Sequence, residues 1–138
     1  MSARILAVDD VSHNLELITY LLRAAGHEVY GAASGEDALG LALRHRPDLV
    51  VLDLQLPDLD GYAVLRRLRA MSELPSVRVI AVTAYAMLGD RDAALAAGFD
   101  GYLAKPIDPA RLAESIEAYL PDQVRSSAGH RAGEVGSG

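Results

Sequence analysis

The chain contains no cysteine, and this absence excludes several kinds of chemistry. None of its 138 residues carries a thiol, so disulfides, thiolate metal sites and cysteine nucleophiles are ruled out. A protein without disulfides is compatible with the reducing cytoplasm, and we expect this location. Because hydrophobic residues make up 51% of the sequence, the chain can bury a core without such cross-links.

Long apolar runs and strong basic clusters are also lacking. No segment approaches the roughly 18 apolar residues of a membrane-spanning helix, and Ser2 and Arg4 lead directly into an apolar stretch, so neither a membrane anchor nor a signal peptide is expected. The formal net charge is −6, which disfavours nucleic acid as a direct partner, because phosphate binding needs clustered Lys and Arg. The densest basic group, Arg66, Arg67 and Arg69, is interpreted as the solvated face of a helix.

Short apolar runs alternate with helical patterns along the chain. Strands are predicted at residues 5–8, 28–33, 49–52, 77–82 and 102–104, and helices at 12–25, 36–46, 62–71 and 90–97, with Gly26 and Gly98 ending two of them. A fifth helix is predicted to start with Asp108 as N-cap and Pro109 at the first helical position. This alternation, with right-handed crossovers, predicts a doubly wound α/β sheet with helices on both faces.

The composition changes after residue 121. Residues 122–138 hold four glycines and three serines but few large aliphatic side chains. Such a segment cannot offset its ordering entropy by burial. We therefore expect one domain over residues 1–121 and a flexible tail over residues 122–138.

Polar residues follow three of the predicted strands, at the point where each strand ends. These are Asp9 and Asp10, then Asp53, then Lys105. Ligands of open α/β sheets bind at the carboxyl ends of the strands, so these side chains are expected to converge. Carboxylates and a lysine in one crevice suit a divalent metal and a phosphoryl group. Taken alone, Asp9 and Asp10 are better explained by an Asx turn or a helix N-cap.

Asp53 and Lys105 are the strongest candidates for chemistry. An aspartate that ends a buried strand needs a partner or a cation, and a carboxylate can attack phosphorus to form an aspartyl-phosphate. The alternative for Asp53 is a loop residue that caps a turn. Lys105 can pair with Asp53 before transfer and with phosphoryl oxygen afterwards. Taken alone, Thr83 is explained by strand propensity and Tyr102 by core packing.

Together these residues resemble the bacterial response-regulator receiver domain. The resemblance rests on Asp9-Asp10, Asp53, Thr83-Ala84 and Lys105-Pro106, with LPDLDG at residues 56–61, and covers about residues 3–120. It implies a flavodoxin-like (CheY-like) fold with five parallel strands in the order 2-1-3-4-5 and five helices. It also implies a two-component phosphoacceptor that catalyses its own phosphorylation, rather than an enzyme with a separate substrate.

The resemblance implies a metal site around the phosphoacceptor. Asp53 would be phosphorylated in a Mg²⁺-dependent reaction. Asp10, Asp53 and the backbone carbonyl of Gln55 would bind Mg²⁺, with Asp9 acting through water.

The resemblance also implies a switch. Thr83 and Lys105 would bind phosphoryl oxygens, and the Lys105–Pro106 bond would be cis. Tyr102 would turn inward as Thr83 moves toward the phosphoryl group, changing the surface of residues 90–97 and the neighbouring strand.

One stretch narrows the resemblance. Residues 82–108, VTAYAMLGDRDAALAAGFDGYLAKPID, are similar to DivK-type single-domain regulators and to receivers fused to hybrid histidine kinases. Asn14 fits the asparagine that these groups carry early in the first helix. Val11 departs from the pattern, because an asparagine often follows the acidic pair. Gln55 occupies a position that influences dephosphorylation in the family.

The implied partners are proteins. A histidine kinase or a histidine phosphotransfer protein would supply the phosphoryl group, and a downstream target would read the result. Leu15 and Ile107 are candidates for a docking patch, although scattered surface apolarity also explains them. A monomer is the default expectation, and a dimer is compatible with the sequence.

Other functions remain open from the sequence. The chain could be a receiver excised from a hybrid histidine kinase, or an interaction module that is not phosphorylated. A small Mg²⁺-dependent phosphatase with an aspartyl-phosphate intermediate would place a second acid where Gln55 stands. A flavin carrier of similar fold would place its phosphate-binding loop where Asp9 and Asp10 would repel the phosphate.

Overall fold

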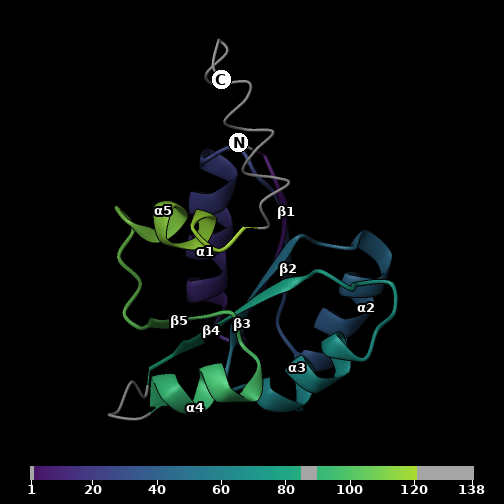
Figure 1. Ribbon diagram of the computed structural model, residues 1–138. Coiled ribbons are helices and arrows are strands. Elements are labelled where there is room, and N and C mark those ends of the chain that lie inside the picture. Colours follow the sequence, from purple (N-terminus) through teal and green to yellow (C-terminus); the bar gives the residue numbers. More distant parts are fainter. Residues whose placement is uncertain (1, 85–89, 121–138) are drawn as a thin grey trace.

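A computed structural model describes residues 2–84 and 90–120, and in these residues strands and helices alternate (Figure 1). The elements are β1 (Arg4–Val8), α1 (Ser12–Ala24), β2 (Glu28–Ala32), α2 (Gly35–His45), β3 (Leu49–Asp53), α3 (Gly61–Arg69), β4 (Arg78–Thr83), α4 (Asp90–Ala97), β5 (Gly101–Ala104) and α5 (Leu112–Glu117). The predicted tail, residues 122–138, lies outside the described residues. No helix within the described ranges is both long enough and apolar enough to span a membrane.

The strands form one parallel sheet in the order β2-β1-β3-β4-β5, which confirms the predicted fold. β3 lies at the centre, and all five of its residues are buried. A run such as LVVLD can occupy this position because parallel strands covered on both faces need apolar side chains on both faces. Gly26 and Gly98, which end α1 and α4, have φ values of 98° and 115°, which side chains disfavour.

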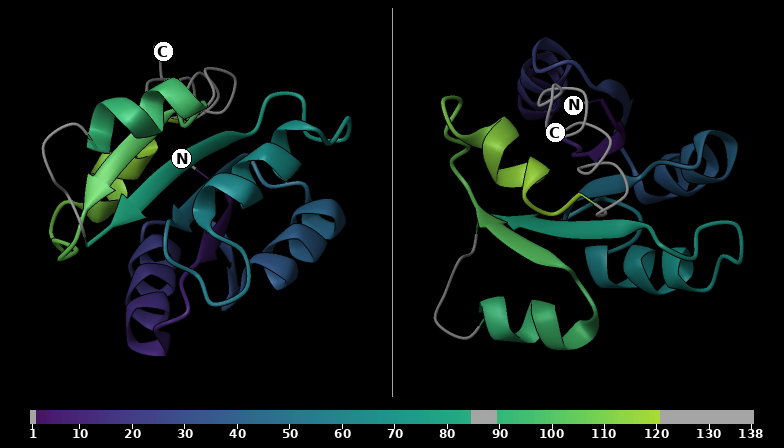
Figure 2. Two further views of the ribbon diagram at one scale, coloured as in Figure 1. Left: turned by 90° about the horizontal axis from the view of Figure 1, so that it is seen from below. Right: turned by 45° about the horizontal axis from the view of Figure 1, so that its top comes forward.

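Helices cover both faces of the sheet (Figures 1 and 2). On one face α1 and α5 lie side by side, and Ile18, Leu22, Leu112, Ile116 and Leu120 bury their side chains against the sheet. On the other face α2, α3 and α4 contribute Ala38, Leu39, Ala42, Val64, Leu65, Leu68 and Ala94. Burial of each large aliphatic side chain contributes about 1.5–3 kcal/mol, so the two layers hold the strands firmly in place.

The register of the sheet brings the predicted site residues to one edge. Val8 pairs with Leu52, Asp53 with Val82, and Thr83 with Ala104. The carboxyl ends of β1, β3, β4 and β5 are therefore level with one another. The side chains that follow or end these strands meet there.

One local prediction was wrong, and a second was incomplete. Asp108 is not the N-cap of the last helix, because α5 begins at Leu112 with Arg111 at the N-cap. The Asp108 carboxylate accepts the Ala110 N–H at 3.1 Å, and its carbonyl accepts the N–H groups of Arg111 and Leu112 at 3.1 and 3.0 Å, which forms a turn ahead of the helix. This turn delays the regular helix by about one turn.

The incomplete prediction concerns Arg69, which is exposed as expected but also makes specific contacts. Its guanidinium donates hydrogen bonds to the carbonyls of Val77 and Gly98 and pairs with Asp100 at 2.8 Å. Arg66 and Arg67 are exposed, as predicted. Arg69 therefore ties the end of α3 to the edge of the sheet opposite the site.

Candidate functional site

Buried polar residues identify the site. Of the described residues, four polar or charged ones are buried, namely Asp9, His27, Asp53 and Thr83. His27 is satisfied structurally, since Nδ1 accepts the Ala3 N–H at 3.0 Å and Nε2 lies 2.7 Å from Glu117. The other three gather at the carboxyl edge of the sheet. A buried carboxylate is stable only with a partner or a cation, so the burial of Asp9 and Asp53 marks this edge as the candidate site.

Three carboxylates form the centre of the site. Asp9, Asp10 and Asp53 each place an oxygen so that all three atoms lie within 4.8 Å of one another. Asp9 and Asp53 are only 1% and 4% exposed, whereas Asp10 is exposed. The Asp9 carboxylate also accepts the Val11 N–H at 2.9 Å. Asp9 therefore forms an Asx turn and belongs to the carboxylate cluster at the same time.

Lys105 joins the two buried carboxylates. Its Nζ lies 3.2 Å from Asp53 Oδ2, as predicted, and 3.0 Å from Asp9 Oδ2, a contact that was not predicted from the sequence. The Lys105 N–H donates to the Thr83 carbonyl at 2.9 Å, which fixes the lysine backbone at the end of β5. Lys105 is the single lysine of the chain, so its amine can be observed selectively.

The electrostatics of the site follow from burial and crowding. Burial raises the pKa of Asp53 and the negative charge of Asp9 adds to the rise, while the Gln55 N–H and Lys105 oppose it. Burial works against the charge of Lys105, but hydrogen bonds and attraction from Asp9 and Asp53 outweigh it and raise the pKa of Lys105. Ionisation of Asp53 therefore costs more free energy in the folded protein than in water, whereas Lys105 stays protonated.

The donor set fits a hard divalent cation. Mg²⁺ prefers oxygen ligands and usually takes only one or two protein carboxylates. Three carboxylates lie together here, and Lys105 can neutralise one negative charge among them. The exposed Asp10 lies on the solvent side of the cluster, where an ion with its waters can enter. Three carboxylates and one ammonium leave two negative charges, which a divalent cation would neutralise.

We predict that Asp53→Asn stabilises the metal-free protein at neutral pH. The folded-state pKa of Asp53 lies above its ordinary value of 3.8. Its stabilising contribution is therefore complete below about pH 3.8 and is lost as the pH rises through the raised folded-state value. Asparagine carries no charge, so the advantage of the variant should grow as the pH rises above 3.8 and should level off above the raised folded-state pKa of Asp53.

Urea denaturation in the presence of a chelator, at several pH values, measures this difference. An ion that binds these carboxylates in the folded state would stabilise it, so added Mg²⁺ is expected to raise the stability of wild type and to raise that of the variant much less. A variant less stable than wild type at pH 7 would contradict the electrostatic account of Asp53.

Thr83 ends β4, the strand next to that of Asp53, and Tyr102 lies on β5, one strand further out. Thr83 is buried at the end of β4. Tyr102, on β5, packs against the core on the α3 and α4 side, and its buried hydroxyl lacks a hydrogen-bond partner within the part of the chain described. Burial raises the pKa of Tyr102, and the charge of Asp90 raises it further. The Lys105–Pro106 peptide bond is cis, as the resemblance implied.

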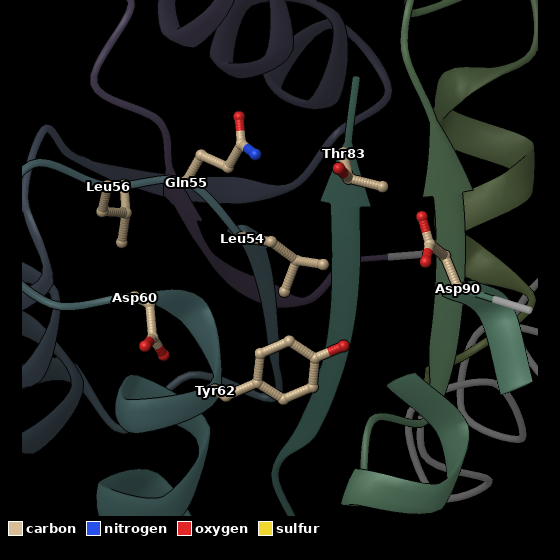
Figure 3. A pocket seen from close by; sticks show the side chains of 7 residues that line it. All are labelled: Leu54, Gln55, Leu56, Asp60, Tyr62, Thr83 and Asp90. Atoms are coloured by element: carbon tan, nitrogen blue, oxygen red, sulfur yellow. The ribbon is translucent and has the colours of Figure 1, made fainter. Parts of the chain in front are cut away.

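A pocket of about 430 Å³ adjoins these residues. Figure 3 shows Thr83 at the end of β4, Asp90 at the start of α4 across from it, and Tyr62 extending from α3 below them. The pocket is also lined by Leu54, Gln55, Leu56 and Asp60. Tyr62 was not predicted from the sequence, because at helical spacing it has the pattern of an ordinary core residue. Its ring packs edge-on against that of Phe99.

The proposed docking residues lie on the opposite side of the sheet. Leu15 and Ile107 are partly buried and pack against the core under α1 and α5. Both therefore have a packing role, and a docking role for them stays a prediction. Val11 is 48% exposed and lies at the entrance of α1.

Comparison with known proteins gives consistent results. Residues 5–117 match the profile of the response regulator receiver domain. The polar-differentiation response regulator DivK of Brucella ovis is 40% identical over 122 residues, which are 88% of this chain and 99% of that protein. DivK of Brucella abortus (strain 2308) has the same identity and coverage.

Solved structures agree with the sequence relatives. The chemotaxis response regulator CheY4 of Vibrio cholerae is similar with a TM-score of 0.81 and 28% identity, over 87% of this chain and all (100%) of that one. A CheY-like response regulator receiver domain protein from Methanospirillum hungatei JF-1 has a TM-score of 0.80 and 32% identity, over 91% and 99% of the two chains.

Proposed function

This chain belongs to the response regulator receiver domain family, and we propose that it accepts a phosphoryl group on Asp53 in a Mg²⁺-dependent reaction. The donor would be the phosphohistidine of a histidine kinase or of a histidine phosphotransfer protein. A downstream protein target would bind the phosphorylated form, as expected for a DivK-like member of a two-component system.

One observation carries the proposal. The Asp53 carboxylate is buried among two other aspartates and is held by Lys105 on Oδ2 and by the Gln55 N–H on Oδ1, at 3.2 and 3.0 Å. A carboxylate that served only as a turn cap would need neither the lysine nor the acidic neighbours. The position two residues after Asp53 is glutamine rather than an acid, which favours a receiver over a phosphatase.

The transfer uses Asp53 as the nucleophile. One carboxylate oxygen bonds to phosphorus while the phosphorus–nitrogen bond of the phosphohistidine breaks, and the electron pair stays on the donor imidazole. With a proton on its other nitrogen, the imidazole leaves as a neutral ring. The Gln55 N–H and Lys105 orient the Asp53 carboxylate before the phosphohistidine arrives. Most of the rate enhancement would therefore come from positioning and electrostatics.

Charge neutralisation comes from the residues around Asp53. Asp10, Asp53 and the Gln55 carbonyl would hold Mg²⁺, with Asp9 acting through water. The bound ion would supply positive charge opposite the phosphoryl oxygens. The Lys105 ammonium would move from Asp53 to a phosphoryl oxygen, and its ion pair with Asp9 would keep it near the site.

The product would bias a conformational equilibrium. Thr83 would donate its hydroxyl to a phosphoryl oxygen, and Tyr102 would adjust to the space that Thr83 leaves. Both lie next to α4, so the surface formed by α4 and β5 is the proposed output face. The phosphorylation shifts populations of existing states, as ligands do.

The proposal is tested by intact-mass spectrometry after incubation with acetyl phosphate. Wild type should gain the mass of one phosphoryl group only when Mg²⁺ is present, and Asp53→Asn should gain none. Rapid quenching preserves a short-lived adduct. Absence of any adduct on wild type, with a receiver known to be phosphorylated as positive control, would overturn the proposal.

A further inference from the structure

The loop between β3 and α3, residues 54–60, connects the phosphoacceptor to the rest of the site. Its base is closed by two backbone hydrogen bonds: the Leu54 N–H donates to the Val82 carbonyl, and the Gly61 N–H donates to the Leu54 carbonyl, both at 3.0 Å. Within the loop, the Gln55 N–H binds the Asp53 carboxylate. A shift of this loop would therefore move a hydrogen bond that orients Asp53.

Asp58 holds the tip of the loop against a different helix. Its two carboxylate oxygens accept the N–H groups of Gly35 and Glu36 at 2.8 and 2.9 Å. Those amides open α2 and have no partners inside the helix. The same two hydrogen bonds lower the pKa of Asp58. Asp58, although exposed, thus makes a two-pronged, charge-assisted contact.

Close packing supports the same contact independently. A Cβ atom added to Gly35 would lie 2.9 Å from Leu59 Cβ and 3.0 Å from Val64 Cγ2. Only glycine lets the loop come this close to the start of α2. The hydrogen bonds of Asp58 and the packing of Leu59 hold the same few residues of the loop.

The helix has a cap of its own. Ser34 is the N-cap of α2, and its hydroxyl accepts the Asp37 N–H at 3.2 Å. Asp58 is a second cap for the start of α2, and it comes from a distant loop. It fixes the loop to a rigid element, in the way that hydrogen bonds to the ligands of a metal site hold those ligands in place.

We propose that Asp58 is a positioning residue that clamps the β3–α3 loop to α2 and thereby sets the place of the Gln55 backbone at the metal site. The inference rests on the proposed function, because it gives Gln55 a role as a ligand. It predicts that the metal site loosens when the clamp is removed, even though Asp58 touches neither Asp53 nor the metal.

The experiment compares Asp58→Ala with Ser34→Ala. Both variants remove a cap from α2, but only the first releases the loop. Isothermal titration with Mg²⁺ should show an affinity about tenfold lower for Asp58→Ala and unchanged for Ser34→Ala. Hydrogen exchange in metal-free protein should be faster at the amides of Gln55, Leu56 and Leu59 in Asp58→Ala alone. Glu36→Gln controls for the loss of one negative charge near the same helix end.

The outcomes separate the clamp from the proposed function. Equal Mg²⁺ affinity in Asp58→Ala and wild type, or equal losses in Asp58→Ala and Ser34→Ala, would overturn the clamp. A loss in Glu36→Gln as large as in Asp58→Ala would also overturn it, because charge alone would then explain the effect. If wild type itself binds no Mg²⁺, the proposed function fails, while the exchange rates still test whether Asp58 holds the loop.

Discussion

Replacing Lys105 with methionine is expected to slow phosphorylation by acetyl phosphate roughly 10²- to 10³-fold at saturating Mg²⁺. The variant removes the ammonium that lies within 3.2 Å of both Asp9 and Asp53. A preorganised positive charge in a partly closed site stabilises the charge that develops on the transferring group. Quenched-flow samples analysed by intact mass measure the rate.

The same substitution should also destabilise the metal-free protein. Asp9 and Asp53 would be left buried without their shared partner, and breaking a buried ion pair in this way costs about 3 kcal/mol or more. Mg²⁺ should restore part of this stability without restoring the rate. Lys105→Arg retains the charge, so it should keep the fold and still react slowly, because its planar group cannot reproduce the two contacts.

Arg111→Met is the matched control for lost charge. Arg111 lies just before α5, and its side chain is 79% exposed, so its loss should leave the rate unchanged. Wild-type rates in both Lys105 variants, each folded by circular dichroism, would show that Lys105 has no part in the transfer.

Replacing Gly61 with alanine is expected to damage both stability and the site. A Cβ at this position would lie 2.7 Å from the Cα of Leu54 and 3.2 Å from the carbonyl oxygen of Asp53. Both neighbours are backbone atoms, so no side chain can rotate away and the loop itself must shift. Overpacking of this kind costs about 1–3 kcal/mol. Urea denaturation should show the loss, and the Mg²⁺ affinity should fall with it.

Gly40→Ala is the opposite case in the same chain. Gly40 lies inside α2, and an added Cβ would meet nothing within 4 Å. Alanine is better than glycine in a helix by about 1 kcal/mol, so this variant should be more stable than wild type. If Gly61→Ala were as stable as wild type and bound Mg²⁺ equally well, the loop would not have the close fit described above.

The sheet edge was predictable because polar residues there interrupt apolar runs. Asp53 and Lys105 could be placed together from the fold class alone, since the carboxyl ends of parallel strands lie at one edge. The pairing of Lys105 with Asp9 could not be foreseen, because it depends on the reach of one side chain across two intervening strands, β3 and β4. Sequence spacing carries no information on such a contact.

Contacts made by long or distant side chains account for the other misses. The helical period correctly places Arg69 on an outer face, but its flexible stem reaches back to the carbonyls at the sheet edge. Asp58 resembles any loop aspartate, and its binding to α2 depends on how the β3–α3 loop folds back. Asp108 has the residue type and position of an N-cap. Its carbonyl, however, accepts hydrogen bonds within a turn that precedes α5, so the regular helix begins only at Leu112.

The most direct test of the central claim identifies the phosphorylated residue chemically. Borohydride reduces an aspartyl-phosphate to homoserine, which peptide mass spectrometry locates in the sequence. After treatment with acetyl phosphate and Mg²⁺, we expect homoserine at position 53 and unmodified aspartate at positions 9 and 10. Homoserine at either of those positions, or none at position 53 in protein that has gained a phosphoryl group, would contradict the assignment of Asp53 as the acceptor.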